Sequence, residues 1–195
     1  MVRSVPADEL LRRAREAAGM GNVREAIRDI TLHALRSHLL TAGHIATVAR
    51  TVGEGIRSSE VEAVSLAGSE TRHGAWEGLE DAVGQALLAV ELAARQFVAG
   101  GGSLEPAERE QALAEFAAMA SDLGEGWRPT REIPALLRAR IESVSGVLAR
   151  TQFSDRAALA DSGAGSHANE ALSQAASGAL RELSGAPDDV SPRDD

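Results

Sequence analysis

The chain has 195 residues, a formal net charge of −9 and no cysteine. The missing cysteine excludes disulfides, thiol nucleophiles and cysteine-ligated zinc or iron–sulfur centres. The acidic balance disfavours binding to the phosphate backbone of nucleic acids. Alanine, the residue with the highest helix propensity, occurs 37 times, while aromatic residues make up only 3% of the chain. No segment alternates in the manner of a strand, so we expect an all-α protein.

Two helices separated by a glycine hinge are expected at the start of the chain. The first runs over about residues 6–18, with Pro6 in its first turn and its end at Gly19. The second begins at Asn22, which forms a capping-box-like start with Glu25. Its buried stripe steps by threes and fours through Val23, Ile27, Ile30 and Ala34.

A third helix over about 44–68 and a fourth over about 71–99 follow. Gly53 and Gly55 lie inside the third helix, where each costs about 1 kcal/mol relative to alanine, and we interpret them as points of close packing against a neighbouring helix. The fourth helix is the longest, and glycines 100–102 end it. Along it, apolar residues alternate between spacings of three and four, which is typical of an a/d seam facing another helix. The seam consists of Trp76, Leu79, Val83, Ala86, Val90, Ala93 and Phe97.

The second half of the chain predicts two further helices and a weaker one. The fifth begins at Ser103 with Pro106 in its first turn, and Trp127 is a packing plug in the loop after it. Thr130 is expected to cap the sixth helix. An alanine-rich helix over about 168–183 is the weak one.

The expected fold is an antiparallel helical bundle of about five to six helices, with one long central helix and a disordered C-terminal tail. The end of the chain is rich in proline and aspartate, which favours disorder. The predicted organisation is an N-terminal helix at 1–20, a helical bundle domain at 21–152, a linker and weak amphipathic helix at 153–184, and a disordered acidic tail at 185–195.

The sequence offers one weak metal-binding candidate and no catalytic signature. Glu70 and His73 stand three residues apart on a helix, which is the unit of ferritin-like di-iron sites, but those sites need two such units. His73 is more simply explained as a polar residue near a helix terminus. His38 and His44 flank a turn and are candidates for contacting a partner or an anion, whereas His33 belongs to a solvated helix face. No nucleophile with an oriented base is visible, so we expect neither an enzyme nor a cofactor.

The sequence also makes a prediction about membranes and location. The first residues lack the apolar core of a signal peptide, and no stretch of 18 or more apolar residues occurs. We therefore expect a cytoplasmic protein that is not transmembrane.

Short motifs in the first third of the chain carry a family resemblance. They lie at 23–27 (VREAI), 32–35 (LHAL), 44–50 (HIATVAR) and 53–56 (GEGI). This set resembles an uncharacterised all-helical family of proteobacteria, a domain of unknown function, over about residues 22–150. The resemblance implies an all-helical fold and does not assign an activity. It does not extend to the C-terminal stretch, which we expect to be peculiar to this chain. In composition and architecture the chain is also similar to phasins, the alanine-rich helical proteins that coat polyhydroxyalkanoate granules.

Three functional hypotheses remain open. The first is a non-enzymatic helical interaction or scaffold protein, which self-associates through the seam or coats an apolar granule or lipid surface as phasins do. The second is a helical-bundle regulatory module with a small-molecule or metal site near Glu70, His73, Gly53 and Gly55. The third is an assembly factor that engages a partner through its acidic tail. The seam is compatible with either an interface or the chain's own core, because both show the same heptad spacing.

Overall fold

The computed structural model describes residues 6–18, 22–62, 68–102, 104–127, 133–150 and 165–185. Every regular element in these ranges is a helix, which confirms the all-α class, and the predicted long central helix is present as α4. In chain order the helices are α1 (Ala7–Ala17), α2 (Val23–Arg36), α3 (Ala42–Glu62), α4 (Gly68–Ala99), α5 (Pro106–Gly126), α6 (Ala135–Ala149) and α7 (Gly165–Leu183).

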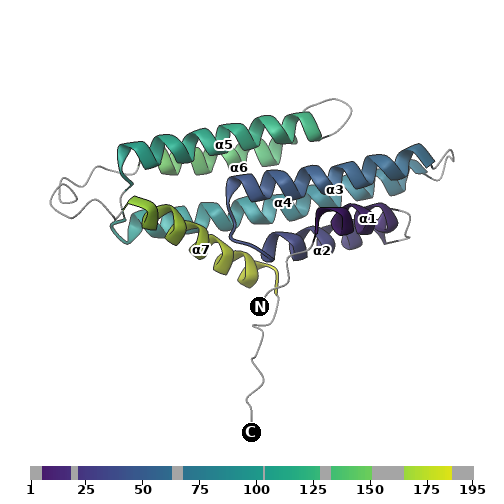
Figure 1. Cartoon of the computed structure of the whole chain (residues 1–195), viewed down its shortest axis with the longest axis horizontal. Helices are drawn as coiled ribbons and strands as arrows, with labels where there is room; N and C mark the ends of the chain where they lie inside the picture. Colours follow the sequence, from purple (N-terminus) through teal and green to yellow (C-terminus); the bar gives the residue numbers. More distant parts are fainter. Residues whose placement is uncertain are drawn as a thin grey trace, which may run out of the picture.

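Helix α4 is the element around which the others are arranged. It packs against α2, α3, α6 and α7. The hairpin of α5 and α6 lies along one side of the α3–α4 pair, and α1 and α2 lie on another side (Figure 1). Helix α7 crosses α4 and reaches α2. The result is a helical bundle built around α4.

The core is built mainly from small and medium-sized side chains of α4. Because four helices surround α4, its buried residues spread beyond the narrow a/d stripe of a two-stranded coiled coil. Alanine at many of these positions lets the neighbouring helix axes come close. The buried apolar residues of α4 are Ala75, Trp76, Leu79, Ala82, Val83, Ala86, Leu87, Ala89, Val90, Ala93 and Ala94.

Glycines lie at several of the contacts between helices. A Cβ atom at Gly78 of α4 would lie 2.2 Å from the carbonyl oxygen of Arg24 in α2. A Cβ atom at Gly55 of α3 would lie 2.7 Å from the Cβ of Ala14 in α1, and one at Gly53 would lie 3.4 Å from the ring of Trp76. The contact at Gly55 confirms its interpretation as a point of close packing, whereas a Cβ at Gly53 would meet its neighbours at an ordinary van der Waals distance.

Two predicted helix starts are wrong in their details. The side-chain oxygen of Asn22 caps no backbone N–H, while its amide nitrogen donates to the carboxylate of Glu25. Helix α5 begins at Pro106 and not at Ser103, since the capping box is formed by Glu105 and Glu108. The carboxylate of Glu108 accepts the backbone N–H of Glu105 at 2.9 Å, which fixes the start of the helix there.

The predicted packing plug after α5 is confirmed. Trp127 is 1% exposed, and the centroid of its ring lies 5.9 Å from that of Trp76. The predicted cap Thr130, the linker residues 151–164 and the tail residues 186–195 lie outside the described residues.

Helix α7, predicted as weak, packs firmly on the bundle. It begins at Gly165, and its residues Leu172, Ala176 and Leu180 are buried. The hydroxyl of Ser177 accepts the backbone N–H of Leu40 at 2.9 Å, so α7 also supplies a partner for the turn between α2 and α3. An alanine-rich face therefore suffices for close packing here, because α4 presents small residues to it.

One stretch in the described part of the chain, Thr71–Ala99 of α4, is long and apolar enough to cross a membrane by length and composition. An 18-residue window in it has a mean hydropathy of 1.2, and 56% of that window is buried inside the bundle. The central helix of a helical bundle meets the same criteria, since it is apolar on most of its faces. That α4 does not span a membrane stays a prediction.

The close approach at Gly78 gives a direct test of the packing. We expect Gly78→Ala to lower the free energy of unfolding by about 2–3 kcal/mol, because the new methyl group meets a backbone carbonyl that cannot rotate away. The matched control is Gly178→Ala in α7, where no atom lies within 4 Å of the added Cβ. That control should stabilise the protein by about 0.5–1 kcal/mol through helix propensity. Urea unfolding followed by circular dichroism measures both, and equal effects of the two changes would contradict the packing.

Candidate functional site

His73, the described half of the metal candidate, bonds to a carboxylate of its own helix. Its Nε2 lies 3.1 Å from Oε1 of Glu77, and its side chain is 65% exposed. The side chain of Glu70 lies outside the described residues. Within the described ranges, no three histidine, aspartate or glutamate side chains are grouped so that they could hold a metal ion. The structure therefore places His73 as an exposed partner of Glu77.

The residues predicted as an interaction seam lie inside the chain's own bundle. Trp76, Leu79, Val83 and Val90 are each at most 4% exposed. Phe97 is half-buried, and a Cβ atom at residue 102 would lie 2.7 Å from its ring. In this fold the seam faces helices of the same chain, so a partner must use other surfaces unless the bundle opens.

The space beside the two glycines of α3 is occupied by protein. Gly53 faces the carbonyl oxygen of Gly126 and the ring of Trp76, each 3.4 Å from the position of an added Cβ. Gly55 faces α1, where Ala14 and the backbone of Leu11 are closer still. Neither glycine therefore leaves an opening beside it for a ligand.

A buried carboxylate, Glu91, joins α4 to α6. It is 6% exposed; its Oε2 accepts from Nη1 of Arg140 at 3.0 Å, and its Oε1 accepts from the hydroxyl of Ser143 at 2.8 Å. Arg95 of the same helix donates to Oε1 as well. Burial alone raises the pKa of Glu91, but the hydrogen bonds from Ser143 and Arg140 and the charge of Arg95 outweigh it, and the pKa lies below its usual value. An ionised carboxylate with these partners holds two helices together and is a poor general acid.

His38 and His44 meet at a small cavity of about 140 Å³ between α1, α2 and α3. Their rings are in edge contact, with centroids 5.1 Å apart. Nε2 of His44 lies 3.2 Å from the carbonyl oxygen of Ala34 in the last turn of α2. Burial lowers the pKa of His44, and the neighbouring His38 adds to this, against the opposing effect of the bond to Ala34. The neutral ring is therefore favoured. Its Nε2 is a partner for a carbonyl oxygen in the last turn of α2, where carbonyl groups lack intrahelical donors.

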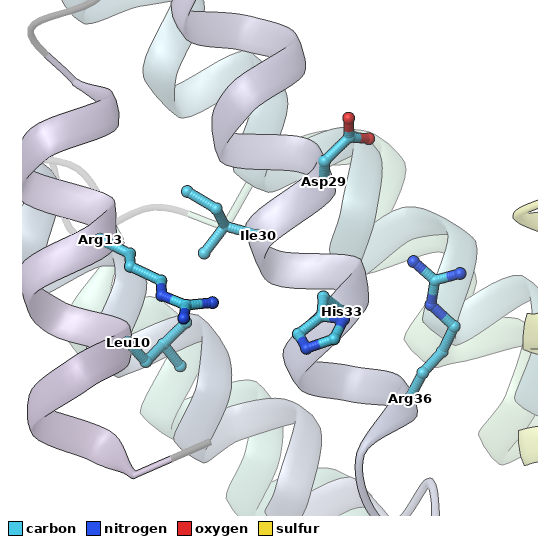
Figure 2. A pocket seen from close by; sticks show the side chains of 6 residues that line it. All are labelled: Leu10, Arg13, Asp29, Ile30, His33 and Arg36. Carbon is cyan, nitrogen blue, oxygen red and sulfur yellow. The ribbon is translucent and has the colours of Figure 1, made fainter. Parts of the chain in front are cut away.

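An open groove of about 470 Å³ runs between α1 and α2, and we call it the α1–α2 groove. Figure 2 shows Arg13 reaching from α1 toward α2, while His33 and Arg36 follow each other along α2. Nε of Arg13 donates to Glu9 at 2.7 Å, and Nε of Arg36 donates to a backbone carbonyl at 3.1 Å. The terminal nitrogens of both guanidinium groups have no partner in the part of the chain that the structure describes. The groove is lined by Leu10, Arg13, Asp29, Ile30, His33 and Arg36.

A second groove of about 240 Å³ lies between α5 and α7, and we call it the α5–α7 groove. The buried side chains of Val90 and Phe116 form its base, and Leu39, which is 45% exposed, lies at the turn that borders it. Glu115 of α5 and Glu170 of α7 are exposed along its edges. The described residues that line this groove include no arginine or histidine. It is an apolar groove with an acidic rim.

The heptad spacing predicts neither of two polar connections between helices. One is Glu91 with Arg140, and the other is Arg24 of α2 with Asp81 of α4, whose side chains lie 2.9 Å apart. Glu91 carries a signal that could have found it, because it is the single charged residue in the stretch 82–94 of α4. Arg24 carries no such signal, since the pairing depends on how α2 and α4 meet.

The role of Glu91 can be tested by removing its charge. We expect Glu91→Gln to lower the free energy of unfolding at pH 7 by about 2–3 kcal/mol, because Arg140 then stays half-buried without a counter-charge. Glu142→Gln, at an exposed position of α6, is the matched control and should change stability by less than about 0.5 kcal/mol. Urea unfolding measures both variants.

The same variant has an expected pH dependence. The pKa of Glu91 in the folded state lies below its ordinary value of 4.5, so its contribution is present above that pH and is lost as the pH falls through the folded pKa. The gap in stability between the wild type and Glu91→Gln should therefore narrow in acid. A gap that stays constant down to the acid limit of folding would contradict the ionised network.

The lowered pKa of His44 leads to a second pH dependence of stability, which comes from a base instead of an acid. Its folded pKa lies below the ordinary value of 6.5, so the unfolded chain takes up a proton before the folded chain does, and stability falls as the pH is lowered through this range. His44→Gln retains an amide donor near the carbonyl of Ala34 but does not titrate. Urea unfolding in a pH series should show a smaller loss of stability on acidification for this variant, and an unchanged loss would refute the assignment.

Comparisons with known proteins place the chain in a family. A family model described as a family of unknown function, DUF6781, matches residues 3–189. A search of the curated proteins and a search of the solved structures found no match. The matched range exceeds residues 22–150, so the expectation that the C-terminal stretch is peculiar to this chain is wrong. The predicted membership of an uncharacterised helical family is confirmed, and the chain belongs to the family of unknown function DUF6781.

Proposed function

We propose that this chain is a non-enzymatic helical interaction protein that binds an amphipathic helix of a partner protein in the α5–α7 groove. The observation that carries the proposal is an apolar groove with two helical walls and an exposed leucine beside it. Leu39 is 45% exposed, while Val90 and Phe116 at the base are 4% and 6% exposed. Grooves of this kind receive apolar side chains from one face of a helix.

The charges along the groove specify the partner further. Glu115 is bonded to Gln111 and Glu170 to Gln174, so both carboxylates are held at the edges by neighbours on their own helices. With no cation among the described lining residues, the rim is complementary to arginine or lysine. The partner helix is therefore expected to carry apolar residues on one face and basic residues beside them.

Because the seam of α4 is buried, the α5–α7 groove is the better candidate for the binding surface. A phasin-like coat, or self-association through the seam, would require α4 to expose side chains such as Leu79 and Val83, both 0% exposed in this fold. Binding in the α5–α7 groove requires no opening of the bundle. We place this activity in the cytoplasm, and we assign the apolar character of α4 to the core and not to a membrane.

A photo-crosslinking amino acid at position 39 tests the groove in cells that express the protein. We expect a crosslink to a partner segment with the apolar and basic pattern described above, identified by mass spectrometry. Leu136, which lies on α6 and is 54% exposed, is the matched control position and should not capture the same segment. Capture of the same segment from both positions, or a crosslink between two copies of this chain, would contradict the proposal.

Charge reversal on the rim tests the expected chemistry of the partner. With the crosslinked segment as a synthetic peptide, Glu115→Arg combined with Glu170→Arg should weaken binding about tenfold, because two attractive contacts become repulsive. The control combines Glu125→Arg with Glu142→Arg, two exposed positions that do not line the groove and change the net charge equally. Fluorescence anisotropy measures the dissociation constants, and similar losses in both pairs would show a general charge effect instead of a site.

A further inference from the structure

The α1–α2 groove and the end of the chain carry opposite charges. We propose that the acidic segment 186–195 of this chain binds in the α1–α2 groove of the same molecule. This inference is independent of the proposed function, because it concerns different helices and a different ligand chemistry.

The groove presents two arginines, of which Arg13 is ion-paired with Glu9 through its Nε. Arg13 and Arg36 use their Nε atoms within the chain and leave their terminal nitrogens without a described partner, and His33 lies between them (Figure 2). The one carboxylate in the lining, Asp29, points away from these three side chains in Figure 2 and lies 3.7 Å from Arg28. Guanidinium groups in this state bind carboxylates strongly, often through two parallel hydrogen bonds.

The segment has a matching composition. Its sequence is APDDVSPRDD, with two pairs of aspartates and a net side-chain charge of −3 from four aspartates and one arginine. Residues 190–193, which begin with Val190, separate the two pairs, and the groove lining includes two apolar side chains, Leu10 and Ile30. Residues 1–40, which include both groove helices, carry seven arginines against five acidic residues in a chain that is otherwise acidic. The acidic segment thus finds its complement in the least acidic part of the chain.

The segment begins close enough to reach the groove. Helix α7 contacts α2, and its C-terminal end lies near α2 in Figure 1. Ser177 bonds to the backbone of Leu40, only four residues beyond the end of α2. Ten residues extend to about 33 Å, so the segment is long enough to pass from the end of α7 along α2. An intramolecular ligand at this distance has a high effective concentration, and an outside acidic peptide would have to displace it.

A spin label at position 191 tests the contact in the full chain. Because the chain has no cysteine, Ser191→Cys gives a single labelling site. At low salt we expect the amide signals of His33, Arg36 and their neighbours to lose most of their intensity through paramagnetic relaxation, while those of α5 and α6 keep theirs. Raising the ionic strength to about 0.5 M should restore the signals, because the Debye length shortens several-fold.

Two charge variants decide whether the contact is the one proposed. Replacing all four aspartates of the segment by asparagine, or combining Arg13→Gln with Arg36→Gln, should each abolish the broadening. Arg13 is exposed and Arg36 is half-buried, and the amide spectrum of each variant shows whether its fold is kept. Broadening that survives either change, or its absence in the labelled wild type, overturns the proposal. A mixture of isotope-labelled and spin-labelled molecules supplies the last test, because broadening across the mixture would assign the segment to a second copy and overturn the intramolecular contact.

Discussion

The close approach of α2 and α4 at Gly78 is the constraint on which both grooves depend. With no side chain at Gly78, the backbone of Arg24 lies against α4, and Val23 packs on Gly74, where an added Cβ would lie 3.0 Å from its Cγ1. Both contacts fix the first turn of α2 on α4, and Arg24 then reaches Asp81 at 2.9 Å. The position of α2 on α4 in turn sets one wall of the α1–α2 groove and the place of the turn that borders the α5–α7 groove.

The position of α6 on α4 is set by a polar connection, whereas the position of α2 is set by close contacts at glycines. The surfaces of α4 and α6 consist largely of alanine, valine and leucine, which pack well in more than one register. Glu91 bonds to Arg140 and Ser143 at a single register of α6, and a shift by one turn would leave a buried carboxylate without its two partners from α6. The desolvation of Glu91 makes such a shift unfavourable, so the network specifies the position of α6 more than it adds to stability.

The sequence predicted the elements of this fold well and their pairing poorly. The period of α4 and the breaks at glycines are local properties, so the helices and the long central helix could be predicted. Gly55 could be read as a contact point, but its partner Ala14 lies 41 positions earlier in the chain and follows from the tertiary arrangement alone. For the same reason the α5–α7 groove had no signal in the sequence, because its lining comes from a turn and four helices, several of which are far apart in the chain. The seam was ambiguous for another reason: the heptad pattern of a bundle core is the pattern of an interface.

The two grooves differ in charge and lie at α2 and at the turn that follows it, so a ligand in one groove could affect the other through α2. Helix α2 lines the α1–α2 groove with Asp29, Ile30, His33 and Arg36, and the turn that follows it lines the α5–α7 groove with Leu39. Coupling would require α2 to move when either groove is filled. The contacts at Gly74 and Gly78 hold the first turn of α2 against the α4 backbone, and the hydrogen bond from Leu40 to Ser177 holds the turn beyond its other end. Because these contacts hold α2 at its start and the turn beyond its end, we expect the two grooves to fill independently.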